Sequence, residues 1–137
     1  MCLIYIRLRS IKETLDTQEP LTIKTQWRYK MDNVTDADFA TNVLEASKSK
    51  PVMLKFTAKW CAPCRALTPI LEDIASEYSD KITIYDLDTD ENSKTALVYN
   101  ITSIPTMMVF IDGQVVKTMV GAKPKQGILT DLAPWLK

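Results

Sequence analysis

Short apolar runs and helically spaced apolar positions alternate along the chain from Thr35 to the C-terminus. Four runs rich in apolar and β-branched residues predict strands: 52–57, 82–87, 106–111 and 114–120. Apolar residues three or four positions apart predict helices: 35–50, 61–79, 92–99 and a C-terminal helix that carries Ile128, Leu129, Leu132 and Trp135 and is interrupted by Gly127 and Pro134.

The order of these elements predicts how the strands pair. The strands over 52–57 and 82–87 flank a helix, so we expect a parallel pair joined by a right-handed crossover. Asp112-Gly113 separates the last two strands, and this dipeptide is a strong signal for an antiparallel hairpin. The sequence therefore predicts an α/β fold, with a central mixed β-sheet flanked by α-helices.

Single residues mark several helix boundaries. Thr35 and Asp38 have the spacing of a capping box, and Lys50-Pro51 is expected to end the first helix. Pro69 lies inside the helix over 61–79. We expect it to kink this helix, because it removes one backbone donor and its ring crowds the preceding turn.

Residues 1–30 show no sustained period of 2 or 3.6, so we expect a loosely ordered N-terminal extension before a domain over 31–137. Residues 21–27 could form one edge strand. Two explanations of the extension remain open. Either Met31 is the natural start of the protein, or the first 30 residues are a genuine, loosely attached arm.

The charge balance and the absence of histidine exclude several kinds of function. The 137 residues include 17 basic and 17 acidic side chains and no histidine. This balance gives no electrostatic reason to expect nucleic acid or an anionic membrane as a partner. Without histidine the commonest metal ligand is missing, as are Ser-His and Cys-His nucleophile pairs. We expect no metal site and no cofactor.

The sequence also carries signals about the compartment. No apolar stretch approaches the roughly 20 residues that span a bilayer. The apolar run over 3–6 is interrupted by Arg7 and Arg9, which makes it too short for the core of a signal peptide. Three cysteines are too few for a disulfide-stapled secreted domain. We therefore expect a cytoplasmic protein, and a monomer.

Redox chemistry is predicted at Cys61-Ala62-Pro63-Cys64, where a buried strand leads into a helix. Residues three apart on a helix share a face, so the two sulfurs can bond to each other. Cys61 is expected at the helix N-terminus, where free N–H groups and the helix dipole favour the thiolate that attacks disulfides. Pro63 costs little there, because first-turn amides have no intrahelical partner.

This placement predicts a two-step exchange. Cys61 is expected to attack a target disulfide, and the more buried Cys64 then attacks Cys61 and releases the reduced target. An external reductant must reset the pair. Two alternatives are weaker: half of a zinc site, although zinc needs about four ligands and only Cys2 remains as a sulfur, or two inert structural cysteines.

Motifs spread over residues 32–137 resemble those of the thioredoxin family. Trp60-Cys61-Ala62-Pro63-Cys64-Arg65 resembles its active-site loop, and Ile104-Pro105-Thr106 its cis-proline loop. Three further motifs match in order and without large gaps: Pro69, Asp112-Gly113 and Val120-Gly121-Ala122. The resemblance implies the thioredoxin fold and a protein-disulfide reductase. It also implies disulfide-containing target proteins and a thioredoxin-reductase-like electron donor as partners.

The resemblance further implies a surface that binds the target. The backbone at Ile104, before a cis Pro105, would pair with an extended segment of the target; the alternative is a plain turn proline. Trp60 would shield the thiolate at the surface rather than pack in the core. Gly121 would either contact the partner or pack beneath the active-site face. Pro63 is expected to tune the dithiol, because the loops of oxidising relatives typically contain histidine.

Two charged residues depart from the family pattern. Thioredoxins carry a buried acid in the active-site strand and a lysine on the neighbouring strand, whereas this sequence has Lys55 and Asp86 there. An unpaired buried charge costs several kcal/mol, so we expect Lys55 and Asp86 to pair and to tune the dithiol together. The alternative is that Lys55 turns to solvent.

Two other functions remain open alongside general disulfide reduction. The first is a reductase or disulfide isomerase dedicated to one partner. The second is a binding or scaffold module that uses the thioredoxin face for docking, with the cysteines incidental.

Overall fold

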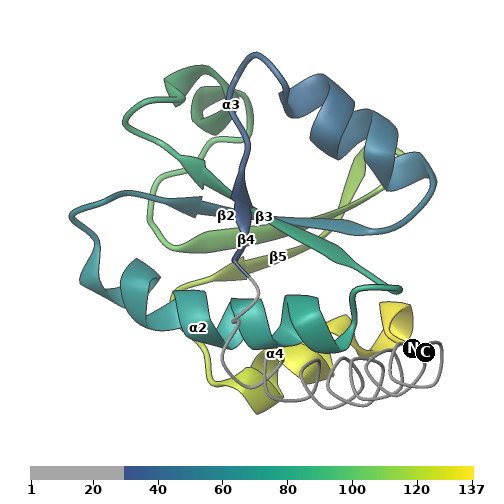
Figure 1. Ribbon diagram of the computed structural model, residues 1–137. Coiled ribbons are helices and arrows are strands. Elements are labelled where there is room, and N and C mark those ends of the chain that lie inside the picture. Colours follow the sequence, from purple (N-terminus) through teal and green to yellow (C-terminus); the bar gives the residue numbers. More distant parts are fainter. Residues whose placement is uncertain (1–29) are drawn as a thin grey trace, which may run out of the picture.

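The computed structural model describes residues 30–137, which form a five-stranded sheet with helices on both faces (Figure 1). The strands lie in the order β1-β3-β2-β4-β5. Their bounds are Asp32–Asn33 for β1, Val52–Thr57 for β2, Thr83–Asp88 for β3, Thr106–Ile111 for β4 and Gln114–Val120 for β5. Strand β3 runs parallel to β1 and β2, whereas β4 runs antiparallel to β2 and β5. The predicted mixed sheet is confirmed.

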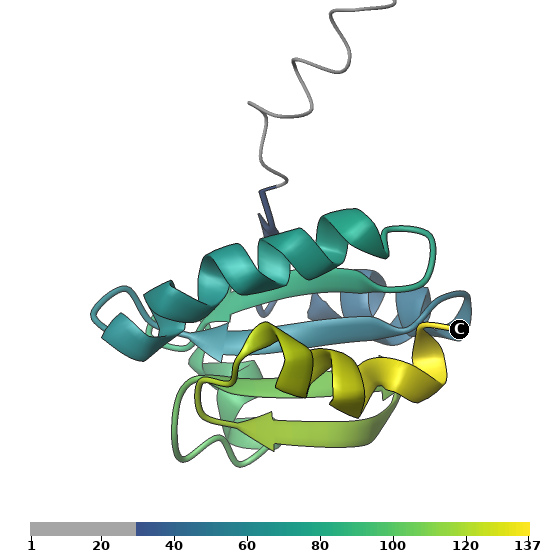
Figure 2. The same cartoon turned by 90° about the horizontal axis from the view of Figure 1, so that it is seen from below.

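Helices α2 (Ala62–Glu77) and α4 (Lys125–Leu132) lie side by side on one face of the sheet (Figure 2). Helix η1 (Ala40–Glu45), the turn η2 (Ala46–Lys48) and helix α3 (Ser93–Val98) cover the other face (Figure 1). The predicted apolar positions of α2 and α4 face the sheet. Buried among them are Leu67, Leu71, Ile74, Ile128 and Leu132.

An aromatic cluster forms the centre of the opposite face. Phe39, Tyr99 and Phe110 meet edge to face, with ring centroids 5.4 to 5.8 Å apart. Both faces of β2 are therefore covered, and its residues Val52, Met53, Leu54 and Phe56 are fully or almost fully buried. This explains why the sequence of this strand is a nearly continuous apolar run rather than an alternating one.

The predicted hairpin between β4 and β5 is confirmed. Asp112 and Gly113 both have a positive φ, of 51° and 76°. A two-residue loop with two positive φ values matches the right-handed twist of the flanking strands, which explains the Asp-Gly pair at this turn.

The first helix is shorter than the predicted range 35–50. Thr35 N–H donates to Asp38 Oδ1 (2.7 Å) and Asp38 N–H donates to Thr35 Oγ1 (3.4 Å), so the capping-box residues form a turn before the helix. Wide π-helical turns then cover Ala40–Glu45. The helical turns continue through η2 to Lys48, and within η2 the Ser47 hydroxyl donates to Leu44 O and accepts from Gly113 N–H.

One strand was not predicted, and the C-terminal helix stops next to the interruption predicted at Pro134 but continues through Gly127. The two-residue strand β1 was not predicted, and it pairs with Tyr85 and Asp86 of β3. The C-terminal helix ends at Leu132, and Trp135 lies in a separate 3₁₀ turn over Ala133–Trp135 because Pro134 cannot continue the α-helix. The strand proposed for 21–27 lies outside the described residues. Within residues 30–137, no helix is long and apolar enough to cross a bilayer.

Candidate active site

Cys61 and Cys64 lie where the loop after strand β2 leads into helix α2. Cys61 is the N-cap of α2, with extended backbone angles (φ −85°, ψ 106°), and its sulfur accepts a hydrogen bond from Cys64 N–H at 3.2 Å. Pro63 occupies the first turn, where a missing N–H costs nothing. The two cysteines form a disulfide with their Cα atoms 5.3 Å apart.

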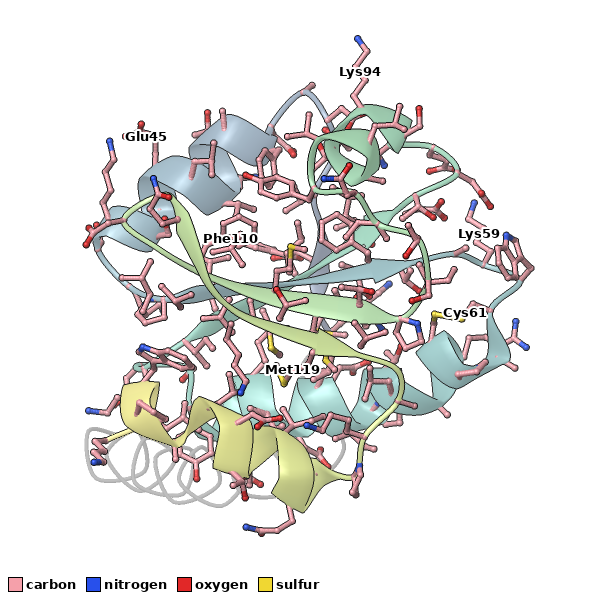
Figure 3. All side chains as sticks on the ribbon, turned by 180° about the vertical axis from the view of Figure 1, so that it is seen from behind. Glu45, Lys59, Cys61, Lys94, Phe110 and Met119 are labelled. Atoms are coloured by element: carbon pink, nitrogen blue, oxygen red, sulfur yellow. A yellow bond between two sulfur atoms is a disulfide. The ribbon has the colours of Figure 1, made fainter. Side chains whose placement is uncertain are left out.

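The two cysteines differ slightly in their exposure to solvent. Cys61 is 4% exposed and Cys64 is fully buried, and both pack against Ala58 and Ile104. Only Cys61 therefore presents any surface to a molecule that approaches the end of α2. Figure 3 shows Cys61 at this end of the molecule, together with Lys59.

The loop before β4 lies directly against the disulfide. The Ile104–Pro105 peptide bond is cis, and Pro105 O accepts a hydrogen bond from Gly121 N–H at 2.8 Å. This bond joins the loop to Gly121, the residue that follows β5. A Cβ at Gly121 would meet no atom within 4 Å, but the residue has a φ of +87°. Its backbone conformation, rather than close packing, therefore explains the glycine.

Trp60 is a surface residue, 69% exposed, and so does not belong to the core. Its indole Nε1–H donates to Asp90 Oδ2 at 2.8 Å, and the neighbouring Lys59 pairs with Glu91 at 3.1 Å. These contacts hold the active-site loop against the loop after β3. Between Trp60 and the segment that ends at Ile104 lies a shallow, largely apolar pocket of about 200 Å³.

Lys55 is buried beneath the dithiol and does not reach solvent. Only 1% of its side chain is exposed, and its Nζ lies 3.2 Å from Asp86 Oδ1. This contact is an ion pair without hydrogen-bond alignment, because Oδ1 is buried and has no well-aligned donor. Burial raises the pKa of Asp86, and the Lys55 ammonium partly offsets that rise.

The ammonium of Lys55 makes two further contacts, both with α2. It donates to Thr68 Oγ1 at 2.9 Å and to Cys64 O at 3.3 Å. The charged group thus touches the backbone of one of the two cysteines. Within residues 30–137, no three cysteine, aspartate or glutamate side chains are grouped where they could hold a metal ion.

Comparison with known proteins identifies the family. The thioredoxin family model matches residues 30–134. The chain belongs to the thioredoxin family. Similar relatives include a thioredoxin of Mycobacterium tuberculosis, 45% identical over 118 residues that cover 86% of this chain and 92% of the relative. Thioredoxin 1 of Synechococcus elongatus is 48% identical over 99 residues, 72% of this chain and 91% of that protein.

A third relative joins two activities in one chain. The bifunctional thioredoxin reductase/thioredoxin of Mycobacterium leprae is 48% identical over 100 residues, which cover 73% of this chain and 21% of the relative. The 118 residues aligned with the M. tuberculosis protein are more than the chain has from Lys30 onward, so that similarity reaches into the N-terminal segment.

Family membership and the site geometry together establish the activity. The chain is a thiol-disulfide oxidoreductase of the thioredoxin type, which reduces protein disulfides through the Cys61-Ala62-Pro63-Cys64 dithiol. The disulfide in the structure is the oxidised state of this pair.

Sequence reasoning missed two residues of the site. Asp90 holds the Trp60 indole, and nothing in its local sequence indicates this contact. Thr68 contacts both Lys55 and Cys64, and the sequence does contain an indication of its contact with Cys64. It follows Cys64 by four positions, the spacing at which a helical threonine hydroxyl reaches the preceding carbonyl.

Proposed function

We propose that Cys61 is the attacking thiol and Cys64 the resolving thiol of a general protein-disulfide reductase. The observation that carries this assignment is the difference in position: Cys61 caps α2 and keeps some exposure, whereas Cys64 is fully buried in the first turn. Free N–H groups and the helix dipole favour a thiolate at the N-cap. A target disulfide reaches Cys61 first.

The reaction follows from this geometry. The Cys61 thiolate attacks one sulfur of the target disulfide, and the other target sulfur leaves as a thiolate. Cys64 then attacks Cys61 Sγ, which forms the internal disulfide and releases the second target sulfur. The target gains two electrons and the protein loses two.

Three features around Cys61 support a binding surface for an extended target segment. The backbone at Ile104, before cis Pro105, packs beside the disulfide and is a candidate for strand-like pairing with the target. Gly121 borders this loop through its bond to Pro105. Trp60 presents an apolar surface next to the shallow pocket, which suits an apolar target side chain.

The proposed electron donor is a thioredoxin reductase, and the proposed compartment is the cytoplasm. The donor is supported by the M. leprae relative, whose name assigns reductase and thioredoxin to one chain. In this role the protein is a monomeric electron carrier in cell redox homeostasis, without a cofactor of its own.

Lys55, Asp86 and Pro63 are the proposed tuning residues. A buried ammonium close to Cys64 favours the thiolate form of the cysteines by charge attraction. Asp86 supplies the counter-charge of Lys55, and its carboxylate is the proposed acceptor for the proton of the resolving cysteine. Pro63 limits the backbone freedom of the loop between the two sulfurs.

A trapping experiment tests these roles. Incubated with a reducible protein such as insulin, Cys64→Ser should accumulate a mixed disulfide through Cys61, and Cys61→Ser should accumulate none. Trapping by Cys61→Ser alone would reverse the two roles. Turnover is measured separately with a thioredoxin reductase and NADPH. If the parent chain reduces no insulin disulfide and still binds proteins through this face, a scaffold role replaces general reduction.

A further inference from the structure

Two donors from different elements converge on the backbone carbonyl of Cys64. The Lys55 ammonium of β2 lies 3.3 Å from Cys64 O, and the Thr68 hydroxyl of α2 lies 3.2 Å from it. Thr68 Oγ1 also accepts from Lys55 Nζ at 2.9 Å. The three groups form a closed triangle of hydrogen bonds around one carbonyl oxygen.

Donors and acceptors balance within this triangle. Lys55 Nζ contacts three acceptors on two elements: it donates to Cys64 O and Thr68 Oγ1 of α2, and it forms the ion pair with Asp86 Oδ1 of β3. The single hydroxyl proton of Thr68 goes to Cys64 O, and its oxygen accepts from Lys55. Because the lysine is buried, these contacts are not weakened by competition with water.

The triangle lies where the helix ladder itself is interrupted. Pro69 follows Thr68 and has no N–H to donate to Arg65 O, and a threonine hydroxyl that bonds four residues back also bends a helix. The N-cap and first turn of α2, which together contain both cysteines, are therefore less firmly joined to the rest of the helix. Lys55 of β2 connects this turn to the sheet instead, through its bonds to α2 and its ion pair with Asp86 of β3.

We propose that Thr68 is a positioning residue for Cys64, which it holds in place through the carbonyl oxygen together with Lys55. The proposal rests on the assignment of Cys64 as the resolving thiol. In the mixed disulfide Cys61 is bonded to the target, so the rate of resolution depends on how well Cys64 is placed to attack Cys61 Sγ. Correct placement of two reacting groups accounts for a large part of the rate of an intramolecular step.

The step that depends on Thr68 balances as follows. The Cys64 thiolate attacks Cys61 Sγ, the Cys61–Cys64 bond forms, and the bond from Cys61 to the target sulfur breaks. The electron pair leaves with the target sulfur, which takes a proton from water. Thr68 itself exchanges neither protons nor electrons.

The aromatic disulfide 5,5′-dithiobis(2-nitrobenzoate), which releases a coloured thiolate, allows the resolution by Cys64 to be measured separately from the attack by Cys61. The reduced full-length chain releases one coloured thiolate when Cys61 attacks and a second when Cys64 resolves. Rapid mixing with the protein in excess records both. All chains carry Cys2→Ser, so that this third thiol does not contribute.

We expect Thr68→Val to slow the second release roughly tenfold relative to the first. Thr68→Ser, which keeps the hydroxyl, should restore the parent ratio. In a Cys64→Ser background, where only the attack occurs, Thr68→Val should leave the single release unchanged. If Thr68→Val does not fold, Thr68→Ala replaces it, because alanine favours the helix and also lacks the hydroxyl.

Thr130→Val is the matched control. Thr130 makes the same kind of bond in α4, from its hydroxyl to Gln126 O at 2.8 Å, but it is exposed and does not contact Lys55. It should change neither release. An unchanged ratio in Thr68→Val, or an equal fall in both releases, would overturn the proposal. Mixed-disulfide trapping by Cys64→Ser would still stand in that case, so the two proposals fail separately.

Discussion

Lys55 and Asp86 are register partners on adjacent parallel strands, and Lys55 Nζ lies 3.2 Å from Asp86 Oδ1 beneath the dithiol. The family pattern has the acid at the position of Lys55 and the lysine at the position of Asp86. As in the family pattern, one positive and one negative charge lie beneath the dithiol. Here, however, the lysine is on β2 and the acid is on β3. Of the two, Lys55 depends more on its partner, because its side chain is 1% exposed and that of Asp86 is 16% exposed.

Removal of either partner should destabilise the fold strongly. Asp86→Leu leaves a buried ammonium without its counter-charge, and we expect it to lower the free energy of unfolding by about 3–5 kcal/mol. Lys55→Met should cost less, since Asp86 retains contact with solvent. The double variant should cost clearly less than the sum of the single variants, as measured by urea unfolding. Additive losses would show that the ions do not stabilise each other.

The same pair should control the cysteines. Lys55→Ala removes the positive charge near Cys64, so the pKa of the reactive thiol should rise. The exchange Lys55→Asp with Asp86→Lys restores one charge of each sign and should recover more activity than either single change. Thiolate absorbance against pH and insulin reduction measure the two effects. An unmoved cysteine titration would leave the pair with a structural role only.

Asp86 and Asp36 should give opposite slopes in the dependence of stability on pH. Burial raises the pKa of Asp86, so the folded state holds this proton more tightly than the unfolded state. Asp86 therefore contributes most at low pH, and its contribution falls as pH rises from the ordinary carboxyl pKa through the raised one. Asp86→Asn should remove this fall in urea-unfolding curves recorded across that window.

Asp36 is the comparison. Burial tends to raise the pKa of Asp36, but hydrogen bonds from the Thr95 hydroxyl, Thr95 N–H and Lys94 N–H hold it below its ordinary value. Its contribution is present above the ordinary pKa and is lost as pH falls through the lowered one. Asp36→Asn should therefore reduce the fall in the free energy of unfolding that acidification causes. Identical profiles for the two variants would contradict both assignments.

The elements around the dithiol were predictable because their signals are local. A buried strand, a Cys-x-x-Cys spacing and an early proline lie within a few residues, and together they place Cys61 at a helix start. The pairing of Lys55 with Asp86 was predicted from the resemblance to thioredoxins, in which the acid and the lysine stand on the opposite strands, and from the cost of an unpaired buried charge.

Long-range contacts explain what the sequence did not show. Strand β1 has two residues and thus no period to detect; it exists because β3 offers it a pairing edge. The spacing of Thr68 from Cys64 is visible in the sequence, but the contact of Thr68 with Lys55 becomes visible only once Lys55 Nζ has been placed. Gly121 has two sequence explanations, and only its φ of +87° gives the reason for a glycine.

A chain that starts at Met31 should keep the fold and the reductase activity. Met31 is 5% exposed and packs with the core beneath α2 and α4, so we expect the domain to begin at this residue. We expect the melting temperature to stay within a few degrees of the full chain. A larger loss would show that residues before Met31 stabilise the domain, a meaningful outcome because the similarity to one relative reaches into that segment.

A chain that starts at Thr35 provides the contrast. It lacks β1, the buried side chains of Met31 and Val34, and the bond from Val34 N–H to Asp86 O at 2.7 Å. Loss of two buried apolar side chains alone should cost about 3–6 kcal/mol. If this chain were as stable as the one from Met31, β1 would not be part of the folding unit.

Two glycines should respond to alanine in opposite directions. Gly121 has a φ of +87°, and Gly121→Ala forces a side chain into the left-handed region although the space around it is open. We expect a loss of about 1 kcal/mol in the free energy of unfolding. Gly127 lies inside α4, and a Cβ there would make ordinary contacts at 3.6 to 3.8 Å with Lys123 and Pro124. Gly127→Ala should therefore stabilise the helix by up to about 1 kcal/mol. Urea unfolding of the two variants at one pH measures both changes against the same parent. A stable Gly121→Ala with weakened binding to insulin would show that the glycine serves the partner rather than the backbone.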